Sequence, residues 1–149
     1  MIGIATADDL VGVADIASWY FYRCKKLGEF NRDVFCSTWQ RLLQSGIGLI
    51  IKRTNGTNVT EAIGVIVFPD PFDGKLAAQS AFWYVIEESK GLEGGMLHLE
   101  AERILVERGV ERIFMTSLIN QRECKVGQYL LKAGYMPLEV VYGKELAHG

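Results

Sequence analysis

A turn sequence, Asn55-Gly56, separates two short runs rich in isoleucine and valine, at residues 47–52 and 62–68. Asparagine followed by glycine between apolar runs is a strong hairpin signal, because both residues accept the positive φ that a tight turn needs. Both runs are almost continuously apolar, so both faces of their sheet are expected to be covered. A third run at residues 76–86 predicts another strand of the same sheet.

Two helices are predicted before this sheet by the signals at their ends. The first begins at the capping-box pattern that opens at Thr6 and is expected to run to about residue 27. The second begins after Asn31, which is expected to cap it, and ends at Gly46. An apolar segment at residues 2–5 predicts a short strand ahead of both helices.

The apolar spacing becomes helical again after the third strand. Leu97, Ala101 and Ile104 fall on one stripe of a helix predicted at residues 94–108. It is expected to be followed by a strand at residues 110–118, a helix at residues 121–133 and a strand at residues 138–146. A strand–helix–strand unit after an antiparallel order predicts a mixed, mostly antiparallel sheet flanked by about four helices. The chain is therefore expected to form a single α/β domain over residues 1–149.

A smaller second stripe lies on the helix predicted at residues 94–108. It contains Met96, Leu99 and Val106, which share a face because a helix brings residues three and four apart together. The stripe points to another neighbour, either elsewhere in the fold or in a second copy of the chain. A homodimer is therefore one expected assembly.

Composition argues against several classes of function. A net charge of −2 without a basic tract argues against general nucleic-acid binding. The three cysteines show no CxxC spacing, so we expect reduced thiols rather than a disulfide framework or a metal site. No leader opens the chain and no apolar run approaches the ~18 residues of a membrane span, so a cytoplasmic protein is expected.

The stretch at residues 85–96 is the most informative for chemistry. A strand ends there, a loop with Gly91, Gly94 and Gly95 follows, and an amphipathic helix begins at once. Such a turn directs backbone N–H groups and the positive end of the helix dipole toward an anion, and glycine lets a pyrophosphate approach the main chain closely. Glycine also serves many turns only through its positive φ, so a plain structural turn stays open. The spacing excludes a P-loop and the dinucleotide GxGxxG motif.

This stretch resembles the acyl-CoA-binding motif of the GNAT superfamily of N-acyltransferases, an Arg/Gln-x-x-Gly-x-Gly/Ala loop after an apolar strand. Lys90 matches the Arg/Gln position and Gly95 the last glycine. The resemblance extends from about residue 67 through the Lys-Ala-Gly-Tyr sequence that ends at Tyr135, and the preceding helices and hairpin fit the N-terminal half of the fold. The Glu-x-x-Tyr-x-Lys sequence at residues 139–144 also resembles short members encoded by bacteriophages, which would place the protein in the host cytoplasm or a virion.

The resemblance implies that acetyl-CoA is the cosubstrate and that a primary amine of a small molecule or a protein attacks its thioester directly. Backbone groups of Val85 and Ile86 would bind the pantetheine arm, and Ser117 or Asn120 would touch that arm from the end of the next strand. The pyrophosphate would lie on the backbone N–H groups of Lys90, Gly91, Leu92, Glu93, Gly94, Gly95 and Met96.

Two positions depart from the family's pattern. Glu93 stands at the motif's first glycine, where a carboxylate would face the phosphates. Leu130 stands where the family often carries a tyrosine acid, and Tyr129 lies one residue earlier, about 100° round a helix. Tyr129 is the candidate that protonates the leaving thiolate, against the interpretation that its ring only packs while its hydroxyl stays wet.

No general base is identified, and His98 is expected on the surface of its helix beside Glu102. The departures at Glu93 and Leu130 keep a second function open. The chain would then be a non-catalytic GNAT-like binding or structural module, acting as a phage or regulatory component. Sequence alone does not choose the acceptor, because one fold serves many substrates.

Overall fold

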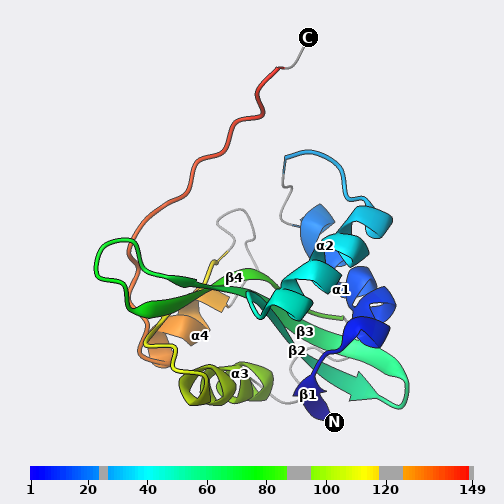
Figure 1. Cartoon of the computed structure of the whole chain (residues 1–149), viewed down its shortest axis with the longest axis horizontal. Coiled ribbons are helices and arrows are strands. Elements are labelled where there is room, and N and C mark those ends of the chain that lie inside the picture. The colour runs from blue at the N-terminus through cyan, green and yellow to red at the C-terminus, as the bar shows by residue number, and fades with distance from the viewer. Residues whose placement is uncertain (24–26, 87–94, 118–125, 148–149) are drawn as a thin grey trace.

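The sheet at the centre of the computed structural model contains five strands among the residues that the structure describes, which are 1–23, 27–86, 95–117 and 126–147. The strands lie in the order β1-β2-β3-β4-β5 (Figure 1). Their bounds are Ile2–Ile4 for β1, Gly48–Asn55 for β2, Asn58–Pro69 for β3, Leu76–Val85 for β4 and Arg112–Phe114 for β5. β1 to β4 pair antiparallel and β5 pairs parallel with β4, which confirms the predicted mixed, mostly antiparallel sheet.

Four α-helices of the described chain flank this sheet, which confirms the α/β architecture. They are α1 (Leu10–Arg23) and α2 (Arg32–Ser45) on one face, and α3 (Met96–Glu107) and α4 (Val126–Lys132) on the other (Figure 1). Alternate residues of β2 enter the two cores, with Ile50 on the α1 side and Leu49 and Ile51 on the α3 side. None of the described helices is both long enough and apolar enough to cross a membrane.

The β2–β3 hairpin confirms the prediction made from Asn55 and Gly56. Asn55 pairs with Asn58, so Gly56 and Thr57 form the turn between them. Gly56 has a φ of +63°, a conformation that residues with a Cβ rarely adopt. Both strands extend beyond the predicted apolar runs, because the ladder of backbone hydrogen bonds continues into the polar residues near the turn.

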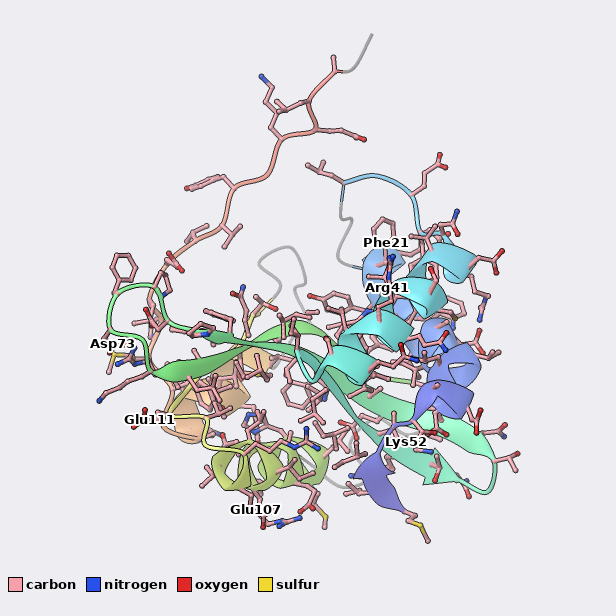
Figure 2. The ribbon with its side chains drawn as sticks, in the orientation of Figure 1. Phe21, Arg41, Lys52, Asp73, Glu107 and Glu111 are labelled. Carbon is pink, nitrogen blue, oxygen red and sulfur yellow. The ribbon has the colours of Figure 1, made fainter. Side chains whose placement is uncertain are left out.

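The predicted helix caps are also present. The N–H of Thr6 donates to Asp9 Oδ2 (2.8 Å), and this capping box opens a 3-10 turn that leads into α1. Lys52 Nζ of β2 donates to Asp9 Oδ1 (2.6 Å) and ties the start of the helix to the sheet (Lys52 is labelled in Figure 2). Asn31 and Gly46 cap the two ends of α2. Residue 27 is not helical, so α1 ends earlier than predicted.

The two strands predicted after α3 differ from the structure. β5 covers only Arg112–Phe114 of the predicted residues 110–118, and residues 138–146 form no strand. Leu138 is 64% and Tyr142 91% exposed, and Figure 1 shows this segment leading away from the sheet. Strand-forming residues need a neighbouring edge to complete their backbone hydrogen bonds, and no described strand lies beside this segment.

The second stripe of α3 lies on the surface of the described structure. Met96, Leu99 and Val106 are each more than half exposed. Isolated exposed apolar side chains are common on protein surfaces, so their exposure alone does not identify an interface. The homodimer stays a prediction.

Candidate functional site

β4 and β5 separate soon after they begin to pair. Three residues of each strand pair, the last being Gln79 and Phe114. At the next position a side-chain contact replaces the backbone pairing. The Ser80 Oγ accepts from the N–H of Thr116 (3.0 Å) and lies 3.2 Å from the Thr116 Oγ1. β4 continues to Val85 against β3, while β5 has already ended. Beyond Ser80, no described strand pairs with this edge of β4.

A β-bulge at Ala81 turns β4 where the two strands separate. Residues 80 and 82 pair with consecutive residues of β3, so Ala81 has no residue opposite it. The extra residue reverses the alternation: Ala78 faces the core under α3, whereas Phe82 faces the core under α1. Gly64 of β3 accommodates the Phe82 ring, since a Cβ at that position would lie 2.3 Å from the ring. The residue after Phe82 is thereby turned toward α3.

That residue is Trp83, and it is fixed by a buried carboxylate. Its indole N–H donates to Glu61 Oε1 (2.9 Å), and Glu61 Oε2 accepts from Arg53 Nε (3.2 Å). The Trp83 ring stacks on the imidazole of His98, with ring centroids 5.4 Å apart and an interplanar angle of 19°. Residues of β2 and β3 therefore set the position of an aromatic surface against α3.

His98 is the centre of a group that we call the His98 cluster, made of Trp83, His98, Glu102, Tyr129 and Tyr135. His98 is 1% exposed. Its Nδ1 lies 3.0 Å from the Tyr129 hydroxyl of α4, and its Nε2 lies 2.9 Å from the Tyr135 hydroxyl. The Tyr135 hydroxyl donates to Glu102 Oε1 (2.6 Å), on the next turn of α3. Among the described residues, every buried side-chain nitrogen and oxygen has a hydrogen-bond partner.

The bonds of the His98 cluster assign its protons. The Tyr135 hydroxyl donates its one proton to Glu102 Oε1, so the Tyr135 oxygen accepts from His98 Nε2–H. His98 Nδ1 is then bare and accepts from the Tyr129 hydroxyl. Burial lowers the pKa of His98, against the opposing attraction of Glu102, so the imidazole is neutral at pH 7. Burial, followed by the hydrogen bond and the charge of Glu102, raises the pKa of Tyr135 well above its usual range.

The structure also places Tyr129 against the start of α3. The Tyr129 hydroxyl lies 3.4 Å from the carbonyl oxygen of Gly95, the N-cap of α3, which has a φ of +85°. A Cβ on Gly95 would lie 2.5 Å from the Tyr129 ring. Glycine at this position therefore serves the packing of Tyr129 as well as the backbone turn. Met96, also predicted to bind pyrophosphate, is the first residue of α3 and half exposed.

Val85 and Ile86, predicted to bind pantetheine, differ in the direction of their backbone groups. The N–H of Ile86 donates to the Thr60 carbonyl of β3 (3.0 Å). In an antiparallel ladder the N–H and C=O of one residue face the same neighbour, and successive residues alternate. The backbone groups of Val85 therefore face the other edge, where β5 has ended. Of the two residues, Val85 has the orientation that an added ligand needs.

Ser117 lies past the end of β5, against the first turn of α4. A Cβ on Gly127 would lie 3.1 Å from Ser117 Oγ, so glycine keeps these two segments in contact. The other predicted cofactor residues, Lys90, Gly91, Leu92, Glu93, Gly94 and Asn120, lie outside the described residues. The described residues contain no group of three or more histidine, cysteine, aspartate and glutamate side chains able to hold a metal ion.

The expectation that His98 lies on the surface is wrong. Its ring packs under Trp83 because the bulge at Ala81 turns that tryptophan toward α3. A signal was present in the sequence, since His98, Ala101 and Leu105 have helical spacing and all three are buried. The bulge itself has no comparable signal.

Neither a protein-family model nor a curated protein sequence matches the chain. Solved structures match it in fold. A probable acetyltransferase has a TM-score of 0.76 at 14% identity, with 100% of this chain and 98% of that chain covered. A predicted acetyltransferase from Clostridium acetobutylicum, solved with acetyl-CoA, has a TM-score of 0.76 at 10% identity, with 97% and 95% covered. A transcriptional regulator from Bacillus halodurans C-125 has a TM-score of 0.79 at 17% identity, with 98% and 99% covered.

These likenesses extend over nearly the whole of each chain, while the sequences share little. At such identities the agreement shows the fold and not the activity. The chain has the GNAT-like fold of these acetyltransferases, as a single α/β domain with a mixed, mostly antiparallel sheet.

Proposed function

We propose that the protein is an N-acetyltransferase that transfers an acetyl group from acetyl-CoA to a primary amine. One observation carries the proposal: the parallel strands β4 and β5 stop pairing at Gln79 and Phe114, within a fold shared with acetyltransferases. This leaves an edge of β4 beside the start of α3. An extended strand edge can bind the amides of a ligand, and a helix N-terminus can bind its pyrophosphate. Acetyl-CoA contains both groups.

The β4 edge suits the pantetheine arm, whose amides can add to an extended strand as a peptide does. Val85 turns its backbone groups to that side. The N-terminus of α3 at Gly95 suits the pyrophosphate, because its first N–H groups have no partner within the helix and the helix dipole favours an anion. The loop from Lys90 to Gly94 would complete this site and rests on the sequence resemblance.

Tyr129 is the proposed proton donor. Attack by the amine leaves a surplus proton on nitrogen, and departure of the thiolate requires a proton on sulfur. Burial, then the charges of Glu102 and Glu61, raise the pKa of Tyr129, so its phenol stays protonated at neutral pH. A protonated phenol on α4, with its ring packed edge-on against Trp83 of β4 (centroids 5.8 Å apart), suits the acid step.

A second function has one observation in its favour. The transcriptional regulator from Bacillus halodurans C-125 matches this fold over 98% of the chain, and the name of that protein is not an enzyme's. A GNAT-like domain that binds acetyl-CoA without transferring the acetyl group would fit the same fold. The two functions differ in whether a free thiol appears.

The test combines binding with turnover. We expect acetyl-CoA at ~1 mM to raise the melting temperature more than ATP or NAD at the same concentration, because a ligand specific for the native state stabilises it. A panel of small amines and lysine peptides is then added and free CoA thiol is measured. No melting shift would remove the cofactor. A shift without thiol release from any acceptor would favour the binding module.

A further inference from the structure

We infer that His98, Tyr135 and Glu102 form a proton relay behind Tyr129, which takes up the proton of the attacking amine and returns it to the leaving thiolate. The inference rests on the proposed function, and it assigns three positioning residues to that reaction. Its basis is the unbroken chain of contacts from Tyr129 to Glu102, in which the shortest contact of each donor leads to the next group.

The relay has one inner end and one solvated end. Tyr129 lies at the inner end, with its ring against Trp83 of β4. Glu102 lies at the other end, and its side chain is 34% exposed, so water reaches the carboxylate. His98 between them is buried under Trp83. A proton that enters at Tyr129 therefore has a continuous path to a group in contact with water.

In the protein without substrate, the hydrogen bonds are oriented so that the proton of the amine can move toward Glu102. The Tyr129 oxygen accepts the surplus proton of the amine and passes its own proton to His98 Nδ1. His98 passes its Nε2 proton to the Tyr135 oxygen, and Tyr135 passes its proton to Glu102. Each of the three side chains Tyr129, His98 and Tyr135 gains one proton and loses one, while the amine loses one and Glu102 gains one. His98 changes tautomer and stays neutral, as burial of its ring requires.

The second half of the reaction reverses this order. Tyr129 gives the proton received from the amine to the thiolate as the carbon–sulfur bond breaks, and the sulfur keeps the bonding electron pair. His98 Nδ1 returns a proton to the Tyr129 oxygen, Tyr135 returns one to His98 Nε2, and Glu102 returns one to Tyr135. The net change is one proton moved from the amine nitrogen to the sulfur. This route also supplies the base that the sequence did not identify.

Two substitutions separate the relay from a structural role. Glu102→Gln keeps an oxygen that accepts from Tyr135 but removes the group that holds the proton. Tyr135→Phe removes two hydrogen bonds but leaves a direct path, since His98 Nε2 and Glu102 Oε1 are 3.3 Å apart. We therefore expect turnover to fall more in Glu102→Gln and the melting temperature to fall more in Tyr135→Phe. If the cluster had only a structural role, the variant with the larger fall in melting temperature would also have the larger fall in turnover.

The kinetic test measures kcat and the KM for acetyl-CoA. We expect kcat to fall by ~10²-fold in Glu102→Gln, the low end for acid–base groups, with KM nearly unchanged. Glu100→Gln is the control, because Glu100 lies two residues earlier on α3, is 33% exposed and pairs with Arg103 instead of the cluster. It should keep wild-type kcat. Wild-type kcat in Glu102→Gln, or matching losses of kcat and stability in both cluster variants, would overturn the relay.

A second measurement needs no substrate. The ¹⁵N chemical shifts of the His98 ring in the protein alone should show a neutral imidazole with its proton on Nε2. Tyr135→Phe should keep the proton on Nε2, because the Glu102 carboxylate, 3.3 Å away, can then accept from it directly. A proton found on Nδ1 in the wild type would contradict the relay even if the protein is an active acetyltransferase. Absence of acetyl transfer by the wild type would instead contradict the proposed function.

Discussion

The two ends of the β4–β5 pair are held by different kinds of interaction. At one end Arg112, the first residue of β5, donates to Asp70 Oδ2 (2.7 Å) and pairs with Asp73 on the β3–β4 loop (Asp73 is labelled in Figure 2). Arg112 and Asp73 are each about one third exposed, whereas the Asp70 side chain is 11% exposed. At the other end the strands separate, and the His98 cluster connects β4, α3 and α4 around the buried imidazole of His98.

This difference indicates which end of the strand pair is more sensitive to substitution. Ion pairs open to water lose much of their attraction to solvent and salt, so one partner can change at small cost. Hydrogen bonds around a buried group such as His98 depend on the geometry and on the placement of protons. We therefore expect substitutions at the buried end to have large effects and those at the Arg112 end to have small ones.

The largest expected effect is that of Gly95→Ala. The new Cβ would meet the Tyr129 ring at 2.5 Å in a residue with a φ of +85°. Backbone strain and overpacking together should lower the free energy of unfolding by about 2–5 kcal/mol, measured by urea denaturation. Gly109→Ala is the matched control, since Gly109 has the same φ of +85° and nothing within 4 Å of an added Cβ. It should cost only about 1–2 kcal/mol.

Equal losses in Gly95→Ala and Gly109→Ala would show that the contact with Tyr129 adds nothing to the cost of the backbone. A double-mutant cycle sharpens this comparison. In a Tyr129→Ala background the ring is gone, so the additional cost of Gly95→Ala should fall toward that of Gly109→Ala. If the costs of Gly95→Ala and Tyr129→Ala are additive, the strain in Gly95→Ala does not come from the Tyr129 ring.

The second effect concerns chemistry instead of stability. Tyr129→Phe removes the hydroxyl that His98 and Gly95 contact, while the ring keeps its place beside Trp83. We expect kcat to fall by ~10²-fold with the KM for acetyl-CoA nearly unchanged. Stopped assays of free CoA thiol measure both constants. Wild-type kcat in this variant would leave Tyr129 with a packing role and make water the acid.

The elements that the sequence predicted correctly are those with local signals. The hairpin at Asn55 and Gly56, the box at Thr6 and the cap at Asn31 each depend on residues within a few positions of one another. The wrong strand at residues 138–146 shows the limit of such signals, because a strand also needs a distant edge.

The candidate site was only partly predictable for the same reason. Tyr129 was chosen because it lies one residue before Leu130, which stands where the family often carries a tyrosine, and its role stays a prediction; the structure adds its contacts. His98 was misplaced because its burial depends on Trp83, and the direction of Trp83 depends on a bulge at Ala81 and on Gly64 of another strand. No pattern within one segment contains that information.

The third effect is at the Arg112 end and should be small. Arg112→Gln removes the charge that pairs with Asp70 and Asp73 and leaves an amide that still reaches them. We expect the melting temperature to fall less than in Gly95→Ala, because Asp70, although 11% exposed, keeps its hydrogen bond from the N–H of Phe72. The fall should shrink further in ~1 M salt, because the Debye length drops to about 3 Å and screens the exposed pair. A loss that does not depend on salt would mean that Arg112 acts by packing.

The smallest effect is the pH dependence contributed by Asp73. The hydrogen bond from Arg112, followed by that from the N–H of Lys75, lowers the pKa of Asp73 to about 2. An unfolded aspartate has a pKa of about 3.9. Because the folded value is the lower one, the stabilisation by Asp73 is complete above pH ~4 and is lost as the pH falls toward 2. Melting temperatures of the wild type and Asp73→Asn should therefore differ above pH 4 and converge near pH 2.

Asp9 and Glu100, whose pKa values are also lowered, are present in both proteins and cancel in the difference. A difference that stays constant from pH 7 to pH 2 would show that the charge of Asp73 does not hold the loop to β5. The contrast between the two ends of the strand pair would then rest on the buried end alone.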